Sequence, residues 1–192
     1  MGKEYFRNKL NDFRKATAYI DRALATNPNN KEGWNLKGIA YLWLKNHKEA
    51  IKCFNIALEI DPLFLDALHY KGITFIELQF HEDAIKCYIK ILDIHRHSIE
   101  AWNNKAFSLA QLGRYEEALM CLNQGIELNP SQASLYYNKA CIESLKLMPD
   151  QSLDSLENAV SLDPTYYPLA ESDPDLAIIT KLEEFKELKR YL

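Results

Sequence analysis

Apolar residues recur along this chain at helical spacing, in paired runs that are joined by a short polar turn. Residues 44–47 form one such turn and residues 112–115 another, where Gly113 can take the left-handed conformation that ends a helix. Each pair of runs predicts a helical hairpin. One hairpin is too small to bury its own apolar face, so we expect neighbouring hairpins to stack.

The hairpins are expected to repeat with a fixed period. Four prolines, Pro28, Pro62, Pro130 and Pro164, fit one ladder of constant step, and Arg96 occupies the vacant position. Each proline follows Asn or Asp, and the residue before a proline disfavours the helical conformation. The pairs therefore predict the end of the second helix of each hairpin. We expect Arg96 to have only a local effect.

Residue size also repeats when the chain is aligned on this ladder, with the proline counted as position 32. Small residues recur where two helices must approach closely, and large apolar residues recur where a gap must be filled. Position 8 holds Gly38, Gly72, Ala106 and Ala140, and position 24 holds Ile20, Phe54, Tyr88, Leu122 and Leu156.

This pattern resembles the tetratricopeptide repeat, whose period of about 34 residues matches the step of the ladder. The run LGRYEEA at residues 112–118 is typical of that family. The resemblance covers residues 1–166 and implies an all-α fold, a right-handed α-solenoid of stacked antiparallel helix hairpins. Five repeats are expected, the first lacking its opening turn, at approximately residues 1–30, 31–64, 65–98, 99–132 and 133–166.

Residues 167–192 break the period. Asp173 and Pro174 are a good helix start, with aspartate as the N-cap and proline in the first turn. Apolar residues then recur every third position, at Leu176, Ile179, Leu182, Phe185 and Leu188. We interpret this segment as a terminal cap with a polar outer face, and a helix that docks on a partner is the alternative.

Composition and charge argue against several classes of function. The net charge is −4, and no basic stretch appears that could hold nucleic acid through its phosphates. The sequence shows neither a signal peptide nor an apolar run long enough to span a membrane. Four cysteines without a secretion signal are typical of a reducing compartment, so the chain is expected to be cytoplasmic.

No catalytic residue, cofactor or metal is expected. Cys53, Cys87 and Cys121 follow one another at the step of the ladder, which predicts equivalent buried positions on successive helices rather than ligands of one ion. His95 and His97 are interpreted as exposed turn residues. Motifs of phosphate-binding loops, zinc proteases and serine hydrolases are absent.

The resemblance implies a concave groove lined by the first helix of each hairpin, at repeat positions 2, 5, 6, 9, 12 and 13. Apolar side chains there would anchor a ligand, although we expect about half of them to be core, and asparagine amides could hold a peptide backbone. The candidate binding residues are Asn35, Leu36, Ile39, Trp43, Asp66, His69, Tyr70, Ile73, Glu77, Glu100, Asn103, Asn104, Phe107, Tyr137 and Asn138. The same set of positions includes Glu32, Ala110, Gln111, Cys141, Ser144 and Leu145.

The predicted function is an adaptor or scaffold that binds a protein or peptide segment with apolar and some basic character. Position 2 carries Glu32, Asp66 and Glu100, and no Lys or Arg stands at positions 2 or 6. A clamp for the terminal carboxylates of chaperones is therefore not expected. Self-association and an accessory role in an enzyme complex are alternatives, and an RNA-binding solenoid is disfavoured by the acidic balance.

Overall fold

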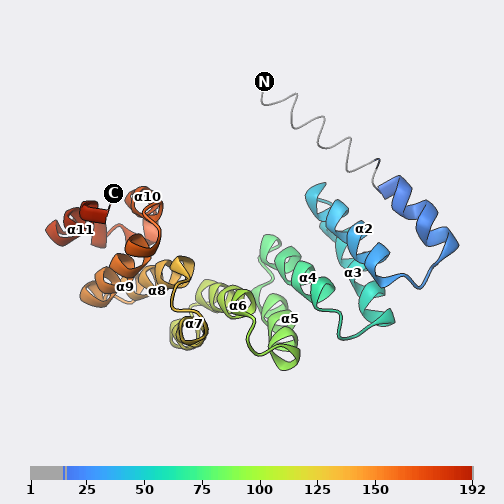
Figure 1. Cartoon of the computed structure of the whole chain (residues 1–192), viewed down its shortest axis with the longest axis horizontal. Coiled ribbons are helices and arrows are strands. Elements are labelled where there is room, and N and C mark those ends of the chain that lie inside the picture. The colour runs from blue at the N-terminus through green and yellow to red at the C-terminus, as the bar shows by residue number, and fades with distance from the viewer. Residues whose placement is uncertain (1–14, 16, 192) are drawn as a thin grey trace, which may run out of the picture. The chain divides into compact units, whose positions relative to one another are not determined.

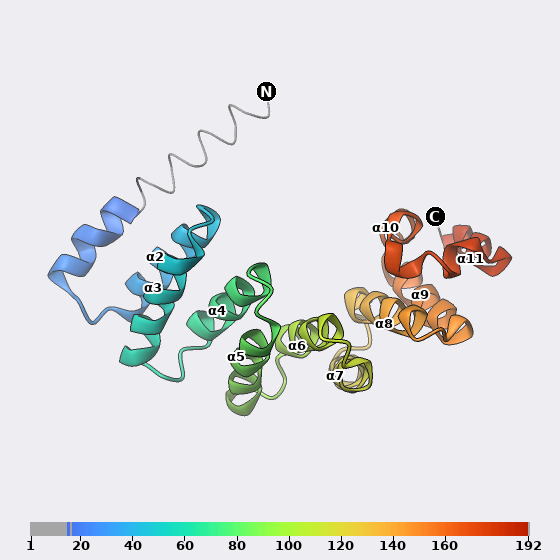
Figure 2. The same ribbon diagram turned by 180° about the vertical axis from the view of Figure 1, so that it is seen from behind.

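The protein is an array of antiparallel helical hairpins. The computed structural model describes residue 15 and residues 17–191, and no strand occurs in that part of the chain. Residues 17–26 are helical. The hairpins that follow pair α2 (Lys31–Trp43) with α3 (His47–Ile60), α4 (Leu65–Glu77) with α5 (His81–Ile94), α6 (Ile99–Gln111) with α7 (Tyr115–Leu128), and α8 (Ala133–Leu145) with α9 (Pro149–Leu162). Both ribbon views show each pair side by side (Figures 1 and 2).

The predicted fold class, all-α with stacked antiparallel hairpins, is confirmed. Each of these helices begins and ends one repeat period after its counterpart in the preceding hairpin. The opening residues of the first predicted repeat lie outside the described residues. The predicted division between an array over 1–166 and a cap over 167–192 stays a prediction.

The chain divides into two compact units, one ending at Arg96 and the other starting at His97. We call them the N-terminal and the C-terminal unit. In the N-terminal unit α3 packs on α4, and in the C-terminal unit α7 packs on α8, so each unit stacks two hairpins. The division falls at the position where the proline ladder is vacant.

The second helices end where the proline ladder predicts. Asp61, Asn129 and Asp163, each followed by proline, are the C-caps of α3, α7 and α9 and have extended backbones. Helix α5 ends at the equivalent residue, Ile94, although Arg96 stands in place of proline. Proline is thus not needed to stop this helix.

Each inter-helix turn contains one residue with a left-handed backbone. These are Lys45 (φ 58°), Gln79 (φ 61°), Gly113 (φ 72°) and Leu147 (φ 61°), which occupy the same position of successive repeats. A left-handed conformation costs a residue with a Cβ about 1–2 kcal/mol. Only Gly113 avoids this cost.

Replacing Leu147 by glycine is therefore expected to stabilise the protein by about 0.5–1 kcal/mol, because relief of the left-handed strain exceeds the added chain entropy. The Leu147 side chain is 72% exposed, so little packing is lost. Urea unfolding would measure the change. Gly113→Leu is the reciprocal control, expected to destabilise by about 1–2 kcal/mol, and a lower urea midpoint for Leu147→Gly would contradict the prediction.

Inside each hairpin, the core depends on matched residue sizes at positions 8 and 24. A Cβ on Gly38 would lie 2.5 Å from the Phe54 ring, and one on Gly72 would lie 2.8 Å from the Tyr88 ring. Both rings are fully buried, and close packing in a protein interior opposes their moving aside. In the next two hairpins, position 24 holds the smaller leucine and position 8 holds alanine: Ala106 with Leu122, and Ala140 with Leu156.

Gly38→Ala is expected to destabilise the protein by about 1–3 kcal/mol through overpacking, despite the better helix propensity of alanine. Phe54→Leu alone should also destabilise, because it leaves a cavity beside Gly38.

The double variant Gly38→Ala, Phe54→Leu reproduces the pair found at Ala106 and Leu122. Its loss of stability should be smaller than the sum of the two single losses, by about 0.5–3 kcal/mol. Additive losses in urea unfolding would show that the two positions are not coupled.

The C-terminal segment is built from short helices. It forms α10 (Tyr166–Ser172), three short 3-10 helices, η1 (Pro174–Leu176), η2 (Ile179–Lys181) and η3 (Leu188–Tyr191), and α11 (Glu183–Glu187). Asp173 is the predicted N-cap, because its carboxylate accepts a hydrogen bond of 2.9 Å from the backbone N–H of Asp175. An apolar period of three residues matches 3-10 geometry, with three residues per turn, better than α-helical geometry.

This segment closes the core of the C-terminal unit. Leu176, Ile179 and Phe185 are buried in one cluster with Leu156 and Val160 of α9. The segment therefore covers apolar residues of α9 that no further hairpin packs against.

Candidate functional site

In the N-terminal unit, α2 exposes two large apolar side chains at predicted groove positions. Leu36 is 55% exposed and Trp43 is 56% exposed, and Ile39 between them is half-buried. Asn35 is buried, with only 5% of its surface exposed, so its amide is not available to hold a ligand backbone. The position of a residue in the repeat does not show how the hairpin packs around it. The prediction that Asn35 faces a ligand is therefore corrected.

On α4 the predicted residues form a half-buried layer over the core. Tyr70 and Ile73 pack against the cluster around Phe54, and the Tyr70 and Phe54 rings stack with their centroids 6.3 Å apart. The His69 ring meets the Tyr70 ring edge-on at 5.3 Å. Asp66, one turn earlier, is exposed. These half-buried aromatic residues thus contact the core and are also partly exposed at the surface.

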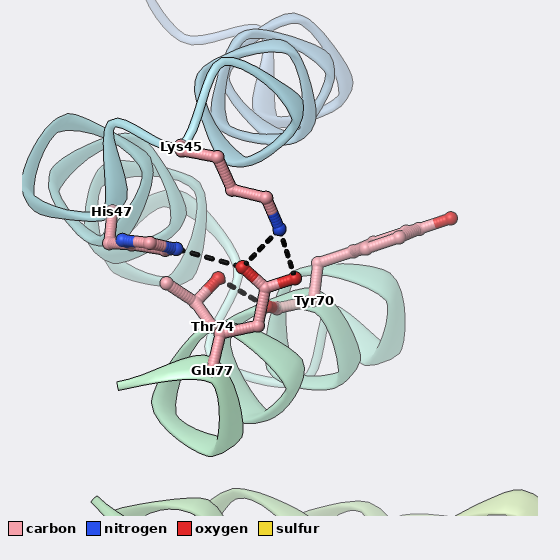
Figure 3. Close-up of polar contacts among 5 residues, drawn as sticks. All are labelled: Lys45, His47, Tyr70, Thr74 and Glu77. Atoms are coloured by element: carbon pink, nitrogen blue, oxygen red, sulfur yellow. Dashed lines mark hydrogen bonds and ion pairs between the residues drawn. The ribbon is translucent and has the colours of Figure 1, made fainter. Parts of the chain in front are cut away.

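Glu77, at the end of α4, is held by the turn of the preceding hairpin (Figure 3). Its two carboxylate oxygens each lie 2.9 Å from the Lys45 ammonium, and one lies 2.8 Å from Nε2 of His47. Beside it the Thr74 hydroxyl donates to the Tyr70 carbonyl at 2.7 Å. Burial alone would raise the pKa of Glu77, but the hydrogen bonds from Lys45 and His47 outweigh it and lower that pKa. Glu77 therefore ties two hairpins together.

Glu77→Gln is expected to lower the free energy of unfolding at pH 7 by about 0.5–1 kcal/mol, as for a partly exposed ion pair. Because the folded-state pKa is lowered, the stabilisation is present above the unfolded pKa and is lost as pH falls through the folded one. The stabilities of the two proteins should thus converge in acid, which urea unfolding at several pH values would test. Asp66→Asn, at an exposed position of the same helix, is the matched control. A pH-independent difference would contradict the assignment.

In the C-terminal unit, two predicted asparagines join neighbouring hairpins. The Asn138 amide on α8 donates to the Asn103 side-chain oxygen on α6 at 2.7 Å. Asn104 is half-buried, Glu100 is exposed, and Phe107 is 41% exposed. The first helices of this unit therefore also present apolar and amide groups together.

Tyr137 is covered by the C-terminal segment. It is only 6% exposed, and its hydroxyl donates a hydrogen bond of 2.5 Å to the Asp173 carboxylate. The Cys141 thiol lies 3.8 Å from the same oxygen. Burial and the neighbouring Asp173 raise the pKa of both Tyr137 and Cys141, so both remain protonated at neutral pH. Tyr137 positions the segment rather than standing open to a ligand.

A cavity of about 160 Å³ lies beside this contact. Every residue that α6 and α8 contribute, except Ile142, stands at a predicted groove position. Asp173 and Asp175 of the C-terminal segment form the remaining wall. The repeat pattern could not predict them, because they lie outside the repeats. The lining residues are Phe107, Ala110, Gln111, Tyr137, Asn138, Cys141, Ile142, Leu145, Asp173 and Asp175.

The cysteines behave as small core residues. Cys53, Cys87 and Cys121 are buried, and Cys141 is half-buried. Burial raises the pKa of Cys53 and of Cys87 to about 11, so these thiols remain protonated. Across the described residues, no group of three or more His, Cys, Asp or Glu side chains could hold a metal ion. Nor is any helix of that part of the chain long and apolar enough to cross a membrane.

The comparison with protein families identifies the type of repeat. The family model described as "Tetratricopeptide repeat" matches residues 32–64 and 99–132, which are the second and fourth of the predicted repeats. The chain thus contains tetratricopeptide repeats, and the resemblance seen in the sequence is confirmed. This repeat builds protein–protein interaction modules, which use the extended concave surface of the stack for binding. The comparison with curated proteins gave no match.

Solved structures share the fold. MamA from Desulfovibrio magneticus RS-1 is 14% identical with a TM-score of 0.75, over 84% of this chain and 95% of that one. YrrB, described as "a TPR protein with an unusual peptide-binding site", is 23% identical with a TM-score of 0.69, over 82% and 81%. PilF from Pseudomonas aeruginosa is 24% identical with a TM-score of 0.70, over 84% and 72%. At these identities the likeness shows the fold alone.

Proposed function

We propose that the protein is an adaptor or scaffold that binds a segment of another protein on the exposed faces of its first helices. The exposure of large apolar side chains at predicted groove positions carries this proposal. In the N-terminal unit these are Leu36 and Trp43, and in the C-terminal unit they are Phe107 and Leu145. Exposed apolar groups of this kind mark binding surfaces, and tryptophan is enriched among the residues that dominate binding energy.

The charge on these faces supports a ligand with some basic character. Asp66 and Glu100 are exposed acidic residues at position 2 of their repeats. Glu77 is different, because the Lys45 ammonium already pairs with it and His47 hydrogen-bonds to it. A basic residue in the ligand would therefore pair with Asp66 or Glu100 rather than with Glu77.

The asparagine pair supports binding of an extended backbone. An amide side chain has two donor and two acceptor positions, and the bond between Asn103 and Asn138 uses one donor and one acceptor. The remaining positions are suited to the N–H and C=O groups of a peptide, whatever its side chains. The cytoplasmic location expected from the sequence stays a prediction.

An affinity pull-down from source lysate would test the proposal. The variant Leu36→Ala, Trp43→Ala, Phe107→Ala should lose at least roughly 90% of specifically captured proteins, because each substitution removes an exposed anchor. The matched control is Leu63→Ala, Ile89→Ala, Met120→Ala, which removes three exposed apolar side chains outside the first helices. Circular dichroism must show both variants to be as helical as the wild type.

Retention of the same proteins by the first variant, or their loss from the control, would place binding elsewhere on the molecule. Self-association is distinguished by light scattering. A mass that stays at 22.3 kDa at all concentrations excludes a stable homo-oligomer.

A further inference from the structure

We propose that the cavity between α6, α8 and the C-terminal segment receives one arginine side chain of the bound protein segment. This inference rests on the proposed function and names the chemistry that one part of the surface recognises. It concerns the C-terminal unit alone. The site combines an apolar wall, two amides and two carboxylates.

The size of the cavity suits a single side chain. Sites for drug-sized ligands and cofactors usually occupy about 300–1,000 Å³, whereas an engineered cavity of about 150 Å³ holds one benzene molecule. At about 160 Å³, this cavity is too small for a cofactor but large enough for a planar guanidinium group. The occupant is therefore one group of a larger ligand.

The two carboxylates that line the cavity favour a cationic ligand. Asp173 accepts hydrogen bonds from the Tyr137 hydroxyl, the Cys141 thiol and the Asp175 backbone, all of which are neutral donors. In the described part of the chain, no Lys, Arg or His side chain lines the cavity or forms an ion pair with Asp173 or Asp175. Burial, followed by repulsion from Asp173, raises the pKa of Asp175. A bound cation would oppose both effects, because an opposite charge nearby favours the ionised carboxylate.

The remaining lining favours arginine over lysine. Phe107 is aromatic and 41% exposed, and a guanidinium stacks on an aromatic face while its edge donates hydrogen bonds. Gln111 and Asn138 supply side-chain oxygens that can accept from it. Because guanidinium has five donors in a fixed plane and is more weakly hydrated than ammonium, it can satisfy several of these groups at once. Lysine would offer one point charge.

The experiment is an NMR titration of the full-length, ¹⁵N-labelled protein with N-acetyl-arginine amide. We expect saturable shifts of the backbone amides of Asn138, Cys141 and Asp175, with half-saturation in the millimolar range expected for so small a ligand. N-acetyl-citrulline amide has nearly the same shape without the charge and should bind at least tenfold more weakly. The corresponding lysine probe, acetylated on its α-amino group and with a free side-chain ammonium, should bind at least threefold more weakly than the arginine probe.

Asp175→Asn should weaken binding of the arginine probe at least fivefold, while Glu187→Gln, the same change of charge at an exposed residue outside the cavity, should leave it unchanged. Asp175→Asn keeps Asp173 and the backbone N–H that it caps, so the segment should stay folded, and the dispersion of the amide spectrum checks this. Equal binding of citrulline, no effect of Asp175→Asn or absence of saturable shifts overturns the cavity proposal. Equal binding of lysine overturns the choice of arginine.

Failure of this inference can be told apart from failure of the proposed function. If no probe binds, yet captured proteins are lost from the variant Leu36→Ala, Trp43→Ala, Phe107→Ala, the groove remains and the arginine site is wrong. If the probe binds but that variant captures the same proteins as the wild type, the cavity recognises arginine and the groove assignment fails.

Discussion

The distance between the two helices of each hairpin is the constraint on which the rest of this structure depends. A large side chain on the second helix can be buried only where the facing position on the first helix is small. Phe54 therefore requires Gly38, and Tyr88 requires Gly72. Once this pair sets how closely the helices approach, the remaining faces of the first helix are directed away from the hairpin core, and residues such as Leu36 and Trp43 are exposed there.

The C-terminal segment shows how closing a stack can also build a site. Its buried residues pack on apolar residues of the last hairpin, and Asp173 accepts a hydrogen bond from the Tyr137 hydroxyl on α8. The same contact brings Asp173 and Asp175 to the edge of the surface lined by Phe107. The C-terminal segment thus adds negative charge to a surface to which α6 and α8 contribute apolar and amide groups.

The fold could be predicted from the sequence because the same pattern of residue types recurs in every hairpin. The proline ladder located helix ends that recur at the same position of each repeat, even at Arg96, where the proline is missing. The small–large pattern located the residues that pack between the two helices. The candidate site was harder to predict, because burial depends on what packs against a residue rather than on its position in the repeat. Asn35 and Tyr137 stand at groove positions and are nonetheless buried.

The C-terminal segment could not be predicted in the same way, because it occurs once and no second copy confirms its pattern. The apolar residue at every third position indicates which side chains are buried, but it does not show where each of the short helices begins and ends. For the same reason, Asp173 was identified as a helix cap but not as a wall of the cavity.

The matched pair in each hairpin also bears on how such an array can change during evolution. Both partners, Gly38 with Phe54 and Gly72 with Tyr88, belong to the same repeat. Duplication, loss or exchange of a whole repeat therefore keeps each pair together. A recombination event inside a repeat, however, could join a helix carrying Ala106 to one carrying Phe54 and create a steric clash. The whole hairpin, rather than the single helix, is the unit that can be copied or replaced without disturbing the core.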